Sequence, residues 1–285
     1  MNKSITLVEC PRDAMQGWKA FIPTAKKVEY INSLLRVGFH TIDFGSFVSA
    51  KAIPQMADTA EVLEGLEITS SSSKLLAIIA NTRGAAEAAR YEQITYLGYP
   101  FSISPTFQLR NTNSTIEASL ASIDEIQDLC TRSNKQLVVY LSMAFGNPYG
   151  DVYNEEILLE WAEQLVSRNV SIISLADTVG LASPQQIQKA CSELIPGYTA
   201  TEFGVHLHST HEAWREKVDA AFSSGCRRFD GALKGIGGCP MANDSLVGNM
   251  NTEWLLEYMK EQDSDSSING TFLQESLRLA DQIFV

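Results

Sequence analysis

The chain contains 285 residues, of which 45% are hydrophobic and 20% are charged. This length fits two average domains or one large barrel, and the composition is typical of a globular protein with a large buried core. The net charge of −12 argues against a nucleic-acid backbone or an anionic membrane surface as a partner, so we expect neither nucleic acid nor membrane.

The five cysteines are scattered without a C-x-x-C pair, and the apolar runs are too short for a membrane span. An odd number of thiols at irregular spacing is not a disulfide framework. We therefore expect a cytoplasmic protein without a targeting peptide.

Short apolar runs that predict strands alternate with amphipathic runs that predict helices. Strands are predicted over residues 4–8, 39–44, 75–80, 93–104, 136–142, 171–175, 201–206 and 227–232. Helices are predicted over residues 23–38, 54–66, 83–90, 114–133, 154–168, 183–194 and 211–224, and most of the remainder is expected to be helical.

Eight units of strand followed by helix predict parallel pairing, because parallel neighbours need such crossover connections. We expect a single domain, a closed (β/α)8 TIM barrel over about residues 4–240 with additional C-terminal helices over about residues 241–285. The alternative is a doubly wound open sheet, which usually has fewer strands. No linker rich in proline, serine or glycine divides the chain.

The stretch from His206 to Thr210 follows an apolar run that ends the seventh predicted strand. Residues i and i+2 of a strand point to the same face, so His206 and His208 are expected to direct both imidazoles at one point. Two imidazoles arranged in this way are suited to holding a metal ion. The remaining ligands would have to come from other strands.

In barrels of this kind, active residues lie at the carboxyl ends of the strands. The polar residues that follow the predicted strands are Arg12, Asp13, Asp43, Ser46, Asn81, Asp177 and Asn249. We expect a divalent metal ion to be held by Asp13, His206, His208 and Asn249. Mg²⁺ and Mn²⁺ are favoured, with Zn²⁺ and Co²⁺ as alternatives, because nitrogen and oxygen donors are mixed. Asp43 and Asp177 are interpreted either as proton-transfer groups or as buried hydrogen-bonding partners.

A glycine-rich segment, residues 234–240, follows the eighth predicted strand and carries Cys239. Glycines permit movement and positive φ angles, so this thiol could deliver or remove a proton when the loop closes. The alternative is an incidental cysteine in a tight turn. In the first loop, Lys19 is a candidate contact for a phosphate or carboxylate group.

Several segments resemble, in order, the motifs of one enzyme family. Residues 8–16, Val-Glu-Cys-Pro-Arg-Asp-Ala-Met-Gln, resemble the E-V-G-P-R-D-G-L-Q signature of the 3-hydroxy-3-methylglutaryl-CoA (HMG-CoA) lyases. Residues 46–49 with 54–56, residues 174–180 and the Gly-Ile-Gly-Gly-Cys-Pro loop at 235–240 are similar to the same family. The resemblance covers roughly residues 4–260, and the glycine-rich loop is its most specific part.

The resemblance implies a metal-dependent lyase that cleaves HMG-CoA into acetoacetate and acetyl-CoA by retro-Claisen chemistry, with a place in leucine degradation. Its implied metal ligands are Asp13, His206, His208 and Asn249. Arg12 would stabilise the enolate, Cys239 would supply a proton, and His206, Asp43 and Asp177 would complete the catalytic group. The expected substrate contacts are Gln16, Lys19, Ser46, Asn81, Arg110 and Asn111. An acyl-CoA thioester is the expected partner, and we expect a homodimer.

The chain departs from the family pattern around this site. Residues 206–213, His-Leu-His-Ser-Thr-His-Glu-Ala, stand where the family has H-C-H-D-T-Y-G-Q, so an acid and a tyrosine are absent. The segment from Cys239 to Asn249 is one residue longer than its family counterpart, and Leu109-Arg110 replaces a lysine pair. The alternatives are therefore a related aldolase or Claisen-type synthase with another substrate, or a weakly active paralogue that binds metal or acyl-CoA.

Overall fold

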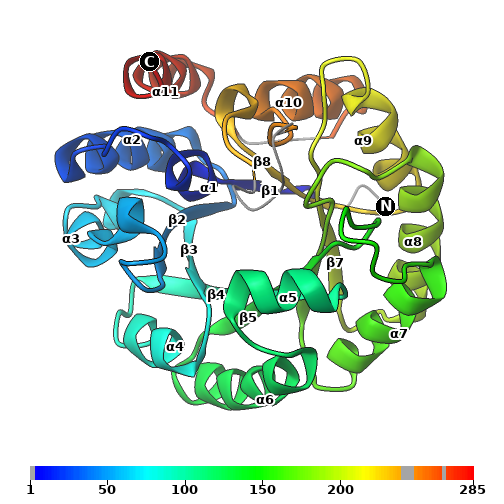
Figure 1. The fold of residues 1–285 in the computed structure, drawn as a ribbon. Coiled ribbons are helices and arrows are strands. Elements are labelled where there is room, and N and C mark those ends of the chain that lie inside the picture. Colours follow the sequence, from blue (N-terminus) through cyan, green and yellow to red (C-terminus); the bar gives the residue numbers. More distant parts are fainter. Residues whose placement is uncertain (1–3, 239–246, 265–267) are drawn as a thin grey trace.

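Eight parallel strands pair in sequence order and close into a barrel in the computed structural model (Figure 1). The structure describes residues 4–238, 247–264 and 268–285. The strands are β1 (Thr6–Glu9), β2 (Thr41–Phe47), β3 (Lys74–Ile79), β4 (Ile94–Ser102), β5 (Gln136–Ser142), β6 (Ile172–Ala176), β7 (Glu202–His206) and β8 (Arg228–Gly231). The last strand pairs with the first, with Val8 opposite Asp230. The predicted TIM barrel is confirmed, and the open-sheet alternative is wrong.

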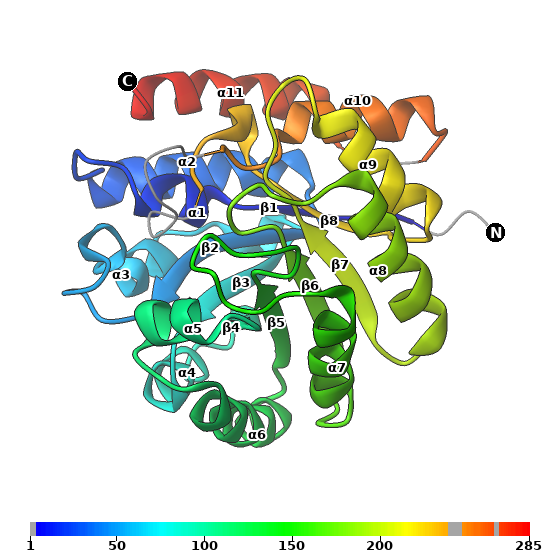
Figure 2. The same ribbon diagram turned by 45° about the vertical axis from the view of Figure 1, so that its right-hand side comes forward.

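Helices surround the barrel and connect successive strands (Figures 1 and 2). They are α1 (Pro11–Gln16), α2 (Thr24–Val37), α3 (Thr59–Glu64), α4 (Thr82–Ala88), α5 (Pro105–Thr112), α6 (Ile116–Arg132), α7 (Glu155–Val166), α8 (Pro184–Gly197), α9 (Trp214–Ser223), α10 (Thr252–Glu261) and α11 (Gly270–Ile283). Short 3-10 helices span Pro54–Met56, Ile68–Ser70 and Leu233–Gly235.

The helix predicted over residues 54–66 is divided into the 3-10 turn Pro54–Met56 and the helix α3. Two short helices were not predicted. These are α1, which directly follows β1, and α5, which follows β4. Both lie at the carboxyl end of the barrel, where short insertions bring side chains to the active site of this fold.

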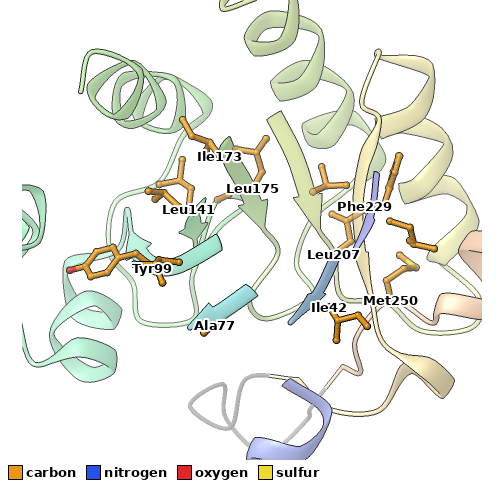
Figure 3. Packing of buried hydrophobic residues seen from close by; sticks show 14 of the residues in the cluster. Ile42, Ala77, Tyr99, Leu141, Ile173, Leu175, Leu207, Phe229 and Met250 are labelled. Atoms are coloured by element: carbon orange, nitrogen blue, oxygen red, sulfur yellow. The ribbon is translucent and has the colours of Figure 1, made fainter. Parts of the chain in front are cut away.

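Alternating strand residues divide the core into two layers. On β5, Leu137, Val139 and Leu141 pack in the large cluster between barrel and helices, part of which appears in Figure 3. Val138 and Tyr140, on the opposite face, belong to a second cluster with Leu76, Tyr96 and Ile172 from other strands. Successive strand side chains point to opposite faces, so the second cluster fills the barrel interior.

The C-terminal helices extend the helical layer. Helix α11 lies beside α2 in both views (Figures 1 and 2), and the hydroxyls of Ser33 and Ser276 are 2.8 Å apart in their buried interface. Within the part of the chain that the structure describes, no helix combines the length and the apolar character needed to cross a bilayer.

Candidate active site and metal centre

Three predicted metal ligands converge at the carboxyl end of the barrel. Asp13 lies on α1, His206 is the last residue of β7, and His208 follows two residues later. One ligand atom from each lies within 4.8 Å of the other two. Asp13 and His208 are buried, and the His206 side chain is 13% exposed. The geometry matches an aspartate and two imidazoles facing a common point, which a divalent ion requires.

Asn249 is brought to this group by backbone pairing. The Met250 amide donates to the Leu207 carbonyl at 3.0 Å, and Asn249 forms an antiparallel bridge with His208. The Asn249 Nδ2 group donates to Asp13 Oδ2 at 2.7 Å and to the Ile236 carbonyl at 2.9 Å. The extra residue after Cys239 therefore does not prevent Asn249 from reaching Asp13.

Two buried atoms have the chemistry of cation ligands. Among the described residues, neither Nε2 of His208 nor Oδ1 of Asn249 has a hydrogen-bond partner of ordinary distance and angle. Buried polar atoms are usually paired, so such atoms call for an explanation. Burial, reinforced by the neighbouring His206, lowers the pKa of His208 to about 4, which keeps its imidazole neutral. Neutral imidazole and amide oxygen are both donors suited to a divalent metal ion.

His206 is held by an acid that the sequence did not reveal. Its Nδ1 lies 3.1 Å from Oδ2 of Asp230, which occupies β8 directly opposite His206 in the barrel register. Burial alone lowers the pKa of His206, but the hydrogen bond and charge of Asp230 outweigh burial and raise it. A carboxylate on one ring nitrogen fixes the imidazole and leaves the other nitrogen for a metal ion.

Arg12 joins two of the predicted acids. Its guanidinium donates from Nε and Nη2 to Asp43 Oδ2, at 2.9 and 2.5 Å, and from Nη1 to Asp13 Oδ1 at 2.9 Å. Burial raises the pKa of Asp43 to about 6 despite the charge of Arg12. The two carboxylates of Asp43 and Asp13 orient the guanidinium at the edge of the metal group, where it can bind a developing oxyanion.

Asp177 lies behind the site. Its Oδ2 accepts from Lys217 Nζ at 2.8 Å, and the same ammonium group donates to the His208 carbonyl at 2.8 Å. Asp177 is not among the described residues that line the cavity. Burial raises its pKa even with the lysine present. This contact agrees with the interpretation of Asp177 as a buried hydrogen-bonding partner. Asp177 holds Lys217, and Lys217 in turn positions the backbone of His208.

A cavity of about 640 Å³ opens onto the metal group. Its polar lining includes the predicted contacts Gln16, Asn81, Arg110 and Asn111, together with Arg12, Asp13, His206 and His208. Gln16 donates to Asp13 Oδ1 at 2.7 Å, whereas the side-chain oxygen of Asn81 caps α4 by accepting from the Gly84 amide. Arg110 lies over the Tyr149 ring at 4.7 Å, at the exposed end of α5. The apolar side chains of the wall include Val48, Ile53, Ile78 and Phe107.

Two predicted substrate contacts do not line this cavity. Among the described residues around the cavity, Lys19 and Ser46 are absent: Lys19 is exposed, and Ser46 is buried in β2. Cys239 lies outside the described residues, so its proton-transfer role stays a prediction.

Sequence reasoning missed three side chains that shape the site. These are Asp230, Lys217 and Tyr140, whose ring packs edge-on against His206 at 5.8 Å and lines the cavity. Asp230 could have been found, because it is an acid near the carboxyl end of a predicted strand that neighbours His206. Tyr140 and Lys217 carry no such signal, since one resembles an ordinary core aromatic and the other an ordinary helix lysine.

Comparison with known proteins decides the family. The sequence pattern of the HMGL-like family matches residues 5–280. The chain belongs to the HMGL-like family. A relative from Bacillus subtilis, hydroxymethylglutaryl-CoA lyase YngG, is 30% identical over 93% of this chain and 88% of its own. The cytoplasmic 3-hydroxy-3-methylglutaryl-CoA lyase of Rattus norvegicus is 32% identical over 86% of this chain and 71% of its own.

Solved structures agree with this assignment. An HMG-CoA lyase from Acinetobacter baumannii, solved in complex with coenzyme A and 3-methylmalate, superimposes with a TM-score of 0.91 at 31% identity, over 99% of this chain and 91% of that one. The Bacillus subtilis HMG-CoA lyase gives a TM-score of 0.91 at 29% identity, over 99% and 94%. The HMGL-like chain is therefore an enzyme of the HMG-CoA lyase type.

Proposed function

We propose that this HMGL-like enzyme cleaves HMG-CoA into acetoacetate and acetyl-CoA with the help of a divalent metal ion. The observation that carries the proposal is the group of Asp13, His206, His208 and Asn249 beside the cavity, with unpaired donor atoms on His208 and Asn249 in the described part of the chain. Family membership supports the reaction class.

The four side chains would hold Mg²⁺ or Mn²⁺, with Zn²⁺ and Co²⁺ as alternatives, because one carboxylate, one amide oxygen and two imidazoles suit each of these ions. When bound, the ion supplies a Lewis acid that lowers the pKa of the substrate hydroxyl group. Asp230 fixes the ring of His206 for this purpose through its 3.1 Å contact with Nδ1.

The proton and charge balance assigns roles to three residues. Asp43 or a water molecule takes the proton of the substrate hydroxyl group. His206 is the alternative acceptor only while one of its ring nitrogens is bound neither to the metal ion nor to Asp230. The carbon–carbon bond then breaks, leaving the ketone of acetoacetate and the enolate of acetyl-CoA. Arg12, oriented by Asp43, stabilises the enolate oxygen. Cys239 supplies the proton that converts the enolate carbon into the methyl group of acetyl-CoA.

The substrate would enter as an acyl-CoA thioester. The relative from Acinetobacter baumannii was solved with coenzyme A, and in this chain Arg110 and Asn111 line the cavity from α5. Asn81 and Gln16 line the same cavity. Lys19 and Ser46 stay as proposed contacts of the substrate-bound form. We also propose that the enzyme is a homodimer and acts in leucine degradation. A cytoplasmic location is proposed because the four described cysteines are free, as a reducing compartment favours.

A substrate panel tests this function against its relatives. Purified enzyme with Mn²⁺ is incubated with HMG-CoA, other 3-hydroxyacyl-CoA thioesters and 2-oxo acids, and the products are identified by mass spectrometry. Cleavage of HMG-CoA with the highest kcat/KM is the expected result. Preference for a 2-oxo acid would instead support the related aldolase or synthase.

The thiol loop provides a second test. Replacement of Cys239 by alanine should lower turnover of HMG-CoA by about a hundredfold or more while metal binding is retained, because only proton transfer is removed. Equal turnover before and after Cys239→Ala would favour the weakly active binding paralogue or a different proton donor.

A further inference from the structure

A second cluster of possible ligands lies deeper in the barrel, on the far side of His206. It begins with Cys10, which joins β1 to α1 and is 1% exposed. The HMG-CoA lyase motif has glycine at this position, so the thiol is a feature of this chain. The Cys10 amide donates to the Gly231 carbonyl at 2.9 Å, which extends the pairing of β1 with β8 by one residue.

The barrel register directs Cys10 inward. Val8 lies opposite Asp230 on β8, and Cys10 follows Val8 by two residues. Residues two apart on an extended segment point to the same face, so Cys10 points to the same side as Asp230. One ligand atom each from Cys10, His206 and Asp230 lies within 4.8 Å of the other two.

Asp230 supplies an independent sign of a missing partner. Its carboxylate is 2% exposed, and Oδ2 accepts from His206. Within the described segments, its second oxygen, Oδ1, has no hydrogen-bond partner. An unpaired buried carboxylate oxygen is costly unless a cation or donor compensates it.

The charges around the thiol favour a cation. Burial raises the pKa of the Cys10 thiol, and the negative charges of Asp230, Asp43 and Asp13 raise it further. Arg12 is already paired with Asp43 and Asp13. A divalent ion would offset this negative field and stabilise the thiolate, with the thiol proton released to solvent.

We propose that Cys10, His206 and Asp230 form an inner metal position that takes thiophilic ions such as Zn²⁺ and Cd²⁺. A thiolate, an imidazole and a carboxylate match these ions and not Mg²⁺. An ion there binds Nδ1 of His206, the nitrogen that faces Asp230, so the ring proton moves to Nε2 and that nitrogen can no longer bind the ion of the outer metal group. Occupation of the inner position therefore inhibits the enzyme. This inhibitory consequence rests on the proposed function, whereas the binding itself does not.

Binding is tested with Cd²⁺ alone as the probe. All proteins carry Cys239→Ser, so that the thiol loop does not contribute, and Mg²⁺ is present in excess. Cadmium titration is followed by the ultraviolet thiolate-to-cadmium charge-transfer band. The protein with Cys239→Ser alone should show a saturable band. Addition of Cys10→Ala should remove this band. Addition of Cys130→Ala, a change at a buried thiol on α6, should leave it in place. Cys191 and Cys226, which hydrogen-bond to each other, are unchanged in every sample.

A band of the same size with and without Cys10, or no saturable band, would overturn the inner position and leave Cys10 as a packing thiol. Inhibition gives the second readout. The measured quantity is the Cd²⁺ concentration that halves each protein's own rate of HMG-CoA cleavage. This concentration should be at least about tenfold higher for Cys10→Ala than for the Cys130→Ala control. If the unmodified protein, with Cys239 in place, does not cleave HMG-CoA at all, the proposed function fails while the spectroscopic binding test still decides the inner position.

Discussion

Asn249 lies 236 positions from Asp13 in sequence, yet the two side chains share a hydrogen bond. Replacement of Asn249 by alanine removes the side-chain oxygen Oδ1, which has no hydrogen-bond partner in the described part of the chain. We expect affinity for Mn²⁺, measured by isothermal titration calorimetry, to fall at least about tenfold. Asn251→Ala is the matched control, because it removes the same amide from the start of α10. The control should lose about 1 kcal/mol of stability but no metal affinity.

Glu9 makes folding stability depend on pH. Its side chain is fully buried and accepts from the Leu233 amide and the Thr252 hydroxyl, and burial raises its pKa from 4.5 to about 8. A carboxyl group whose pKa rises on folding takes up a proton when the chain folds. Its contribution to stability is therefore greatest at low pH and is lost as pH rises from 4.5 to about 8.

Replacement of Glu9 by glutamine removes this ionisation. Urea unfolding at several pH values should show that the unfolding free energy of the unmodified protein falls more steeply across this range, by up to about 1.4 kcal/mol per pH unit. Parallel pH profiles for the two proteins would mean that Glu9 does not bind a proton on folding.

The sequence predicted the candidate metal ligands but not the residues that hold them in place. The i, i+2 spacing of His206 and His208 depends only on the strand, and the alternation of strands brings Asp13 to the same end. Asp230 and Tyr140 support His206 through contacts between β7 and its neighbours. Such contacts depend on strand register and side-chain packing, which a single sequence does not specify.

At the scale of elements, Asp177 and Lys217 connect the end of β6 to α9. Replacement of Lys217 by methionine leaves Asp177 as an unpaired buried charge and removes the donor to the His208 carbonyl. The expected loss of unfolding free energy is about 3–5 kcal/mol, measured by urea denaturation. The double variant Asp177→Asn with Lys217→Met should recover part of this loss, because no charge stays buried.

Lys189→Met is the control for this change. Lys189 pairs with Glu155 at 3.6 Å, with side chains 50% and 37% exposed, so its loss should change stability by less than about 1 kcal/mol. Equal effects at Lys217 and Lys189 would show that the buried pair does not hold the β6 and α9 segments together.

The two unpredicted helices differ in how far they could have been found. Helix α5 begins with Ser104 as N-cap followed by Pro105, the same signal that correctly predicts a helix after Ser183-Pro184. Helix α1 is only six residues long and has no side-chain cap at Cys10. It packs against β2, and such tertiary support is absent from local sequence patterns.

At the scale of the whole molecule, the alternation of eight strands with helices was enough to predict the closed barrel. Closure explains why the site draws on both ends of the chain. Pairing of β1 with β8 brings Asp13 to the residues after β7 and β8, and α11 packs against α2 outside the barrel (Figure 1). The identity of the substrate is not specified at this scale, because many chemistries share the TIM barrel.

The central claim is that a divalent ion held at this end of the barrel supports cleavage of HMG-CoA. The most direct measurement is the amount of acetyl-CoA and acetoacetate formed from HMG-CoA by purified enzyme, with Mn²⁺, after chelation, and with the variant Asp13→Asn. The account predicts equal amounts of both products with Mn²⁺, and their loss after chelation and in the variant. Failure to form acetyl-CoA from HMG-CoA by enzyme with bound metal would contradict it.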